Sequence, residues 1–94
     1  MRDLNDAFGK ALRDLRLGAN LAQTDFPPKV SREYVSLLER GVRSPSLETI
    51  DDLAGVIGVH PLTLVLQCYL TREPETNVKQ LLDEVQREIR LEMI

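Results

Sequence analysis

The sequence contains few of the features that mark secreted or membrane-bound chains. Its 94 residues include one cysteine, no tryptophan and only 4% aromatic residues. Because Cys68 cannot form an intrachain disulfide, a reducing cytoplasm is the expected compartment. No apolar run approaches the roughly 20 residues needed to cross a bilayer, and no apolar signal segment follows Met1. We therefore expect a cytoplasmic protein that does not bind membranes.

Features of catalytic, metal-binding and cofactor-binding sequences are also missing. His60 is the only histidine, and with one cysteine eight residues away it does not form a recognisable set of metal ligands. The sequence has no glycine-rich phosphate loop, and nothing in it suggests a catalytic triad. We therefore expect no enzymatic activity, no metal and no cofactor. His60 is interpreted as a helix cap or packing residue, and Cys68 as a buried, inert thiol.

Signals for β-strands are almost absent, since apolar and polar residues do not alternate and no Asn-Gly or Asp-Gly hairpin turn occurs. Apolar residues instead recur at steps of three and four, which is the spacing of an amphipathic helix. This spacing predicts an all-α chain whose first helix begins at Asp3 or Asn5 and ends at Leu17. Further helices are predicted over residues 22–26, 32–40, 47–57, 61–70 and 77–93.

Capping and helix-breaking residues set these boundaries. Ser31 and Ser46 suit the N-cap position, and Asn77 with Gln80 resembles a capping box. Pro61 suits the first turn of a helix. Glycine and proline are expected to end the earlier helices, and these predicted terminators are Gly18, Pro27, Gly41 and Gly58.

The last three predicted helices differ in how much apolar surface they carry. The helix over 47–57 is expected to be buried through Leu47, Ile50, Leu53, Ala54 and Ile57. The helix over 61–70 is apolar nearly all round, so it belongs in the core or beneath a second subunit. A polar link over 71–76 leads to a C-terminal helix with an apolar stripe. That stripe needs a partner, because an isolated helix of this length is marginal in water.

The charged residues are divided unevenly along the chain. Residues 1–46 contain eight Lys or Arg and six Asp or Glu, a balance of +2, whereas residues 47–94 contain four and nine, a balance of −5. The net charge of −3 does not exclude nucleic-acid binding, because binding depends on the local potential. The short helix after Ser31 is flanked by Lys29, Arg40 and Arg43, which is typical of an element that enters a DNA groove. We therefore favour sequence-specific binding to double-stranded DNA over catalysis.

Several short motifs occur in a characteristic order. They are Leu12-Arg-Asp-Leu-Arg16, Leu21-Ala-Gln23, Ser31-Arg-Glu-Tyr-Val-Ser36, Glu39-Arg-Gly41, Ser44-Pro-Ser-Leu-Glu-Thr49, Leu53-Ala54 and Gly58-Val-His-Pro-Leu62. With these motifs, residues 8–66 resemble the Cro/C1-type helix-turn-helix domain of Xre-like bacterial and phage regulators. The resemblance implies a five-helix, lambda-repressor-like DNA-binding domain over residues 1–70, and a dimer that binds a (pseudo)palindromic operator. The chain departs from the family in one turn, since Phe26-Pro-Pro-Lys-Val30 is shorter than usual and contains no glycine.

The resemblance, together with the exposed arc of the helix over 32–40, assigns roles to particular side chains. The predicted base contacts are Ser31, Arg32, Glu33, Ser36 and Leu37. The predicted contacts to the DNA backbone are Gln23, Lys29, Arg40, Arg43 and Ser44. The alternative for Arg32 and Glu33 is a solvated helix N-terminus, for Leu37 a protein contact, and for each cation a solvated surface charge. Arg16 and Glu39 are assigned a structural ion pair between the first helix and the end of the recognition helix.

Residues 71–94 are predicted to be a linker and a dimerisation helix. The predicted dimer contacts are Leu62, Leu66, Tyr69, Leu81, Leu82, Val85 and Ile89. The expected function is a homodimeric repressor, and the resemblance implies that it regulates its own gene. One alternative is an antitoxin-type interaction module, which would leave the C-terminal stripe exposed until a toxin binds. Another is a controller-type activator, which would share every DNA-binding feature and also contact RNA polymerase.

Overall fold

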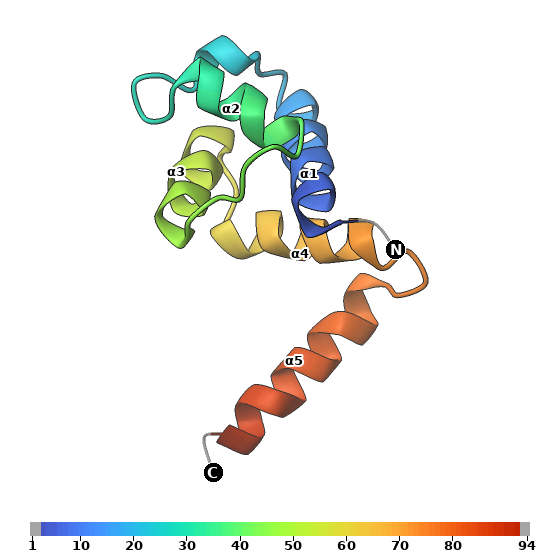
Figure 1. The fold of residues 1–94 in the computed structure, drawn as a ribbon. Coiled ribbons are helices and arrows are strands. Elements are labelled where there is room, and N and C mark those ends of the chain that lie inside the picture. Colours follow the sequence, from blue (N-terminus) through green and yellow to red (C-terminus); the bar gives the residue numbers. More distant parts are fainter. Residues whose placement is uncertain (1–2, 93–94) are drawn as a thin grey trace.

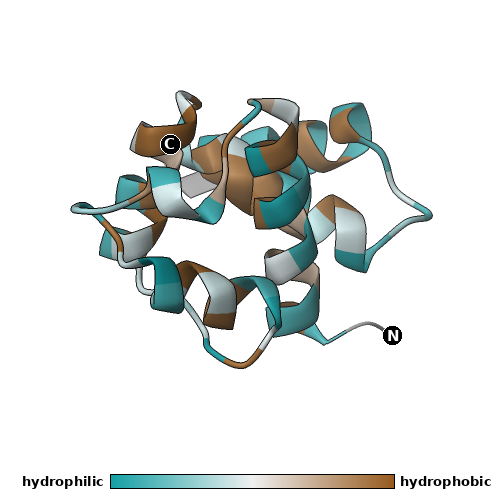
Figure 2. Ribbon diagram, turned by 90° about the horizontal axis from the view of Figure 1, so that it is seen from above, coloured by the Kyte–Doolittle hydropathy of each residue, from teal (hydrophilic) through white to brown (hydrophobic). Residues whose placement is uncertain are grey.

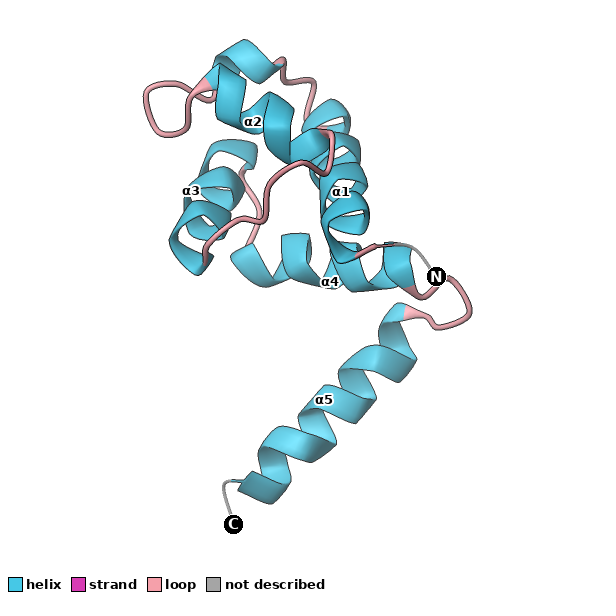
Figure 3. Cartoon of the chain, in the orientation of Figure 1, coloured by secondary structure: helices cyan, strands magenta, loops and turns pink. Residues whose placement is uncertain are grey.

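The protein is described here by a computed structural model that covers residues 3–92 (Figure 1). The described residues form five α-helices and one 3-10 helix, in the order α1 (Leu4–Gly18), η1 (Gln23–Asp25), α2 (Arg32–Glu39), α3 (Leu47–Ile57), α4 (Pro61–Arg72) and α5 (Val78–Glu92). No strand occurs among them (Figure 3), so the predicted all-α fold class is confirmed. Met93, the predicted end of the last helix, lies outside the described residues.

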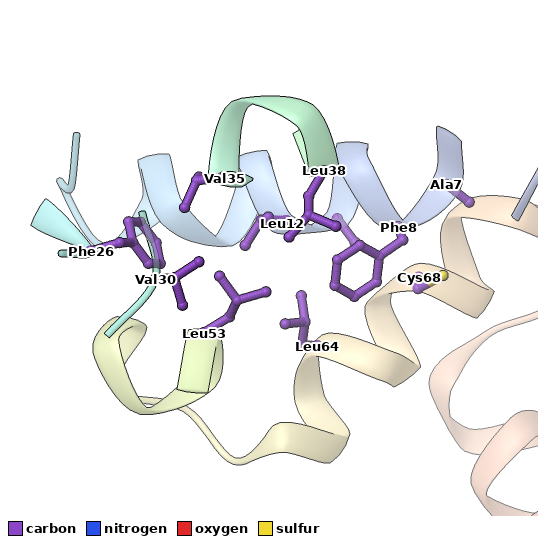
Figure 4. Close-up of a cluster of buried hydrophobic side chains, with 11 residues drawn as sticks. Ala7, Phe8, Leu12, Phe26, Val30, Val35, Leu38, Leu53, Leu64 and Cys68 are labelled. Carbon is purple, nitrogen blue, oxygen red and sulfur yellow. The ribbon is translucent and has the colours of Figure 1, made fainter. Parts of the chain in front are cut away.

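Helix α1 is central to the packing of the first 72 residues. It packs against both α2 and α4, and α4 also packs against α3. The helices carry hydrophilic and hydrophobic residues on different sides (Figure 2), and the hydrophobic sides meet in one cluster (Figure 4). The buried members of this cluster are Ala7, Phe8, Ala11, Leu12, Phe26, Val30, Val35, Leu38, Leu53, Leu64 and Cys68.

Polar side chains cap the helix N-termini as the sequence predicts. Each cap accepts a hydrogen bond of 3.0–3.1 Å from a backbone N–H two or three residues later, and the capping residues are Ser31, Ser46, His60 and Asn77. At the opposite ends of α2 and α3, Gly41 (φ 76°) and Gly58 (φ 91°) adopt left-handed backbone that favours glycine. The predicted spans of α2 and α3 are therefore correct to within one residue.

The second predicted helix is present but is one residue shorter at each end. A short helix is predicted over residues 22–26, and the structure has the 3-10 helix η1 over Gln23–Asp25. Pro27 and Pro28 have no N–H, so the carbonyls of Gln23 and Thr24 cannot accept the bonds that would complete an α-helical turn. The remaining bonds span three residues, from Asp25 N to Ala22 O (3.0 Å) and from Phe26 N to Gln23 O (3.5 Å).

The end of α1 also differs from the prediction. Gly18 was expected to follow the helix in left-handed backbone, but it is the last helical residue. The left-handed position is taken by Asn20 (φ 61°), and asparagine tolerates that conformation better than most residues. A hydrogen bond of 3.1 Å from Leu21 N to Arg16 O closes the turn. The left-handed residue, Asn20, therefore lies two positions after Gly18, where it was predicted.

Leu47 is not a core residue, contrary to the expectation for the helix over 47–57. It is 83% exposed. As the first residue of α3, it stands beside an open apolar hollow of about 220 Å³. Residues of α1, α3, α4 and the α2–α3 connection line this hollow, among them Leu4, Pro45 and Tyr69. Since no side chain of the described residues fills the hollow, the periodicity that places Leu47 on the apolar face of α3 does not bury it.

Helix α5 leaves the domain after the link at residues 73–77 (Figure 1). Between residues 78 and 90 every side chain is exposed except Leu81, which is half-buried. Among residues 3–92 no single helix is long and apolar enough to cross a membrane. Helices α3 and α4 reach that length and hydropathy only together, across a bend of 104°.

A glycine permits the close approach of α1 and α2. A Cβ atom added at Gly9 would lie 2.6 Å from the backbone oxygens of both Leu38 and Glu39. Such distances require one helix to move, because backbone atoms cannot rotate out of the way. The approach therefore fixes the separation of α2 from the rest of the domain.

Gly9→Ala is expected to lower the free energy of unfolding by about 1–3 kcal/mol, as overpacking of a tight core does. Gly55→Ala is a matched control within α3, because nothing lies within 4 Å of its added Cβ. That control should stabilise the protein by roughly 0.5–1 kcal/mol through helix propensity. Urea denaturation measures both, and a Gly9→Ala variant as stable as the parent would contradict the tight contact.

Candidate nucleic-acid interface

Helix α2 is a short element held on the outside of the domain by a narrow apolar face. Val35 and Leu38 are fully buried, whereas Arg32 and Glu33 in its first turn are exposed. The eight residues of α2 are too few for a stable isolated helix, so its shape depends on this burial and on its caps. The outcome is a rigid helix that presents its opposite side to solvent.

The predicted base-contacting residues all lie on α2 or at its N-cap. Ser31, Arg32 and Glu33 are exposed, while Ser36 and Leu37 are half-buried. The Ser31 Oγ accepts a bond from Tyr34 N at 3.1 Å, which leaves its hydroxyl hydrogen free to donate. These residues therefore offer donors, acceptors and one apolar side chain within two helical turns.

The turn before α2 is anchored by two apolar residues instead of a glycine. Phe26 is 1% exposed and Val30 is 6% exposed, and Figure 4 shows both side chains beside Leu53 in the core. The carbonyl of Phe26 accepts bonds from Lys29 N (3.1 Å) and Val30 N (3.3 Å). Burial on both sides of the two prolines thus sets the start of α2, where the family pattern has a glycine turn.

A buried ion pair fixes the other end of α2. Arg16 Nε lies 2.6 Å from Glu39 Oε2, and Arg16 Nη2 donates to Glu39 Oε1 at 3.0 Å. The two side chains are only 10% and 6% exposed. The hydrogen bond to Glu39 raises the pKa of Arg16, against a smaller opposing effect of burial, so the guanidinium stays charged.

Two further bonds extend this ion pair into a network. Arg16 Nη1 donates to the carbonyl of Leu21 at 2.8 Å, and Gln23 Nε2 donates to Glu39 Oε1 at 3.1 Å. One network therefore joins α1, the segment before η1, η1 itself and the end of α2. Gln23, a predicted phosphate contact, has one of its two amide hydrogens engaged inside the protein and one remaining.

The predicted backbone-contacting cations differ in their surroundings. Lys29 Nζ lies 3.6 Å from Asp52 Oδ1, but its side chain is 67% exposed, so this ion pair is weak. Within residues 3–92 no ion pair involves Arg32, Arg40 or Arg43. All three side chains are exposed. Three guanidinium groups on α2 and the segment after it are therefore available to an anionic partner.

The predicted contacts to the DNA backbone lie in different parts of the structure. Gln23 and Arg40 lie at the two elements joined by the Arg16–Glu39 network, whereas Ser44 lines the apolar hollow beside the start of α3. Ser46 caps α3 next to it, accepting from Thr49 N at 3.1 Å. The N-terminus of α3, an 11-residue helix, adds partial positive charge near this segment.

The predicted dimer contacts lie on α4 and α5. Leu62 is 68% exposed, and Leu82, Val85 and Ile89 are 40–54% exposed. The remaining three, Leu66, Tyr69 and Leu81, are half-buried. Sequence reasoning missed Leu47 and Leu4, two exposed apolar residues at the hollow. The position of Leu47 in the sequence could have indicated its exposure. It directly follows the Ser46 cap, so it lies at the start of α3, before the helix reaches the core.

A family model described as helix-turn-helix matches residues 12–64. The control protein C.BamHI of Bacillus amyloliquefaciens is 36% identical over 61 residues, which is 62% of this chain and 75% of that protein. The matched region contains η1, the turn, α2 and α3.

Solved structures of similar fold include two of the clp gene regulator ClgR from Corynebacterium glutamicum. One has a TM-score of 0.68 at 25% identity, and covers 73% of this chain and 92% of that chain. The other has a TM-score of 0.71 at 20% identity, and covers 97% of this chain and 95% of that chain. Because the second match takes in nearly all residues, the shared fold includes α5.

Arg16→Ala or Glu39→Ala is expected to lower the free energy of unfolding by about 3–5 kcal/mol, because either change leaves a buried charge without its partner. The double variant should lose less than the sum of the two single variants. Lys10→Ala is the control, since it removes the exposed Lys10–Asp14 pair (2.8 Å) and should change stability by less than about 0.5 kcal/mol. Urea denaturation measures all four. A single variant with parental stability would show that the pair does not hold α2.

Proposed function

The chain belongs to the Cro/C1-type helix-turn-helix family of DNA-binding transcription regulators, and we propose that it is a repressor that binds its operator as a homodimer. The observation that supports this most strongly is α2 itself. It is a short helix, clamped at one end by the Arg16–Glu39 pair, whose exposed Arg32 has no intrachain ion-pair partner within the described residues. A major groove admits a helix of this kind.

The side chains of α2 supply direct readout of bases. Arg32 donates two hydrogen bonds to O6 and N7 of a guanine, and Glu33 accepts from N4 of a cytosine. Leu37 contacts a thymine methyl group, while the Ser31 and Ser36 hydroxyls bond to base edges or nearby phosphates. Because Leu37 is half-buried, its side chain reaches a base only when the whole of α2 lies in the groove.

The flanking segments position the helix without reading sequence. The proposed contacts to phosphates come from Gln23, Lys29, Arg40, Arg43 and Ser44. Arg40 and Arg43 make the stronger phosphate contacts, because Lys29 is already in an ion pair with Asp52. The acidic second half of the chain predicts weak non-specific binding, so affinity depends on correct base contacts.

Two protomers are proposed to present their α2 helices to successive major grooves. Half-sites would then lie about one helical turn (~34 Å) apart. Residues 1–70 form the DNA-binding domain, and residues 71–94 provide the linker and dimerisation helix. The proposed contacts are Leu62, Leu66, Tyr69, Leu81, Leu82, Val85 and Ile89. A two-fold dimer buries the same apolar patch on both copies, which accounts for the exposed surface of α4 and α5.

Repression follows if the operator overlaps a promoter, because the bound dimer excludes RNA polymerase. The dimer forms by mass action, so the concentration of the protein controls occupancy. The likeness to the control protein C.BamHI supports a second candidate, an activator that contacts RNA polymerase from an adjacent site. Transcription in vitro from a promoter with the operator placed over it or upstream of it separates the two, since only an activator raises transcription from the upstream site.

The DNA-binding proposal is tested by selecting bound sequences from random duplex DNA with the purified protein. We expect one motif with two-fold symmetry and a half-site spacing near one helical turn. Enrichment of an asymmetric single half-site would contradict the dimer but not DNA reading. Failure to enrich any sequence would contradict the proposed function and favour an interaction module.

Arg32→Ala is expected to weaken binding to the selected site by about 1–3 kcal/mol and to relax preference at one base pair in each half-site. Arg43→Ala is the matched comparison, because a lost phosphate contact should weaken all sequences alike and reduce the salt dependence. Binding isotherms on the selected site, a single-base variant and an unrelated duplex measure both effects. If the two variants show the same sequence-independent loss, Arg32 contacts only phosphate.

A further inference from the structure

The apolar hollow beside α3 is left open by the residues that the structure describes, 3–92. Four elements meet there: the start of α1, the α2–α3 connection, the first turn of α3 and the outer side of α4. Its rim combines two exposed apolar side chains, Leu47 (83% exposed) and Leu4 (39% exposed), with the polar side chains of Asn5 and Ser44. Ile50, Val65 and Tyr69 line it below. The hollow holds about 220 Å³, enough for one or two aliphatic side chains.

Helix α5 carries the complementary feature, an apolar stripe without a cover. Val78, Leu82, Val85 and Ile89 recur at steps of three and four and are 40–54% exposed. The opposite side of the helix is charged, and Lys79 pairs with Asp83 at 2.7 Å. A stripe of this kind is stable in water only when it packs against another apolar surface.

We propose that in the homodimer α5 of each protomer lies across the partner's hollow and α4, so that the two C-terminal helices are exchanged. This inference rests on the homodimer of the proposed function and specifies what the dimer contact is. Each protomer supplies one stripe and one hollow, so a two-fold arrangement buries both surfaces twice. The exchange leaves no unpartnered apolar face on α4 or α5.

Interface size favours this arrangement over pairing of α5 with α5 alone. The stripe consists of a few half-exposed aliphatic side chains on a helix about 22 Å long. Burying them removes roughly 300 Å² of apolar surface per protomer. A stable interface buries about 800 Å² per partner. The exposed side chains of α4 and of the rim at Leu47 and Leu4 supply further apolar area when α5 packs against them.

The composition of α4 also fits a surface that is covered in the dimer. From Pro61 to Thr71 the helix contains no charged residue, although its side chains at Leu62 and Thr63 are exposed. Interface cores are depleted in charged residues, whereas ordinary exposed helix faces are not. The exposed part of α4 thus has the composition of a surface that is covered in the assembled protein.

Helix α5 does not cover the hollow of its own chain. The Asn77 side chain accepts from Gln80 N at 3.0 Å, which fixes where α5 starts, and the helix then runs away from the domain (Figure 1). The 97% coverage of the longer ClgR match shows that a helix in this position also occurs in another chain of the same fold. An arm that leaves its own domain is suited to a neighbouring copy.

Cross-linking between two single-cysteine variants tests the exchange. Both carry Cys68→Ala, which removes the only natural thiol; one then carries Leu47→Cys and the other, lengthened by a tag, Leu82→Cys. After the two are mixed and equilibrated, a short bismaleimide should join one chain of each kind. Arg87→Cys is the control for Leu82→Cys, because it lies on the charged side of α5 and should give little product.

Each of the other possible results would contradict the exchange of C-terminal helices. Efficient joining of Leu82→Cys to itself would show that α5 pairs with α5. A third variant carries Leu47→Cys and Leu82→Cys in one chain; joining within that chain, without product in the mixture, would show that α5 folds back on its own domain. If no product forms and sedimentation shows a monomer, the dimer itself is absent. Selection of DNA by the unmodified protein is independent of all three, so it separates failure of the exchange from failure of DNA binding.

Leu47→Asp provides a second test that does not depend on cross-linking. Since Leu47 is 83% exposed in the protomer, the change should leave folding intact. Under the exchange it should raise the dimer dissociation constant at least tenfold in sedimentation without DNA, and Glu48→Gln at the next position should not. An unchanged dissociation constant for Leu47→Asp would overturn the proposal.

Discussion

The ion pair between Arg16 and Glu39 is the contact on which the position of α2 depends. It joins the last turn of α1 to the last residue of α2, and it also fixes Leu21 and Gln23 through the same guanidinium and carboxylate. Such a buried pair adds little net stability compared with apolar packing, yet it specifies one arrangement strongly. Gly9 lets α1 and α2 approach closely enough for the pair to form.

Fixing α2 from within the core frees its outer side for recognition. Val35 and Leu38 hold the helix from below, Phe26 and Val30 hold the turn before it, and Glu39 holds its end. None of these residues is needed to read DNA in the proposed function. Substitutions at Arg32, Glu33 and Ser36 should therefore leave the fold intact. The flanking arginines still hold α2 against the phosphates.

Much of the fold follows from local patterns in the sequence. The caps at Ser31 and Ser46 and the glycines after α2 and α3 placed those helices correctly, because capping is decided within a few residues. Periodicity could not show that Leu47 is exposed, since burial depends on whether a distant element covers it. The resemblance supplied the Arg16–Glu39 pair, which spacing alone does not reveal. The hollow was not predictable, because residues from four separate elements form it.

We propose that α2 and its flanking segments form the surface that binds DNA. Amide chemical-shift changes of the full chain on titration with its selected duplex test this most directly. We expect the largest changes at Ser31–Leu37, at Gln23 and Lys29, and in the segment from Arg40 to Ser46, with small changes on the charged side of α5. Large changes confined to α4 and α5, with α2 unaffected, would contradict the account.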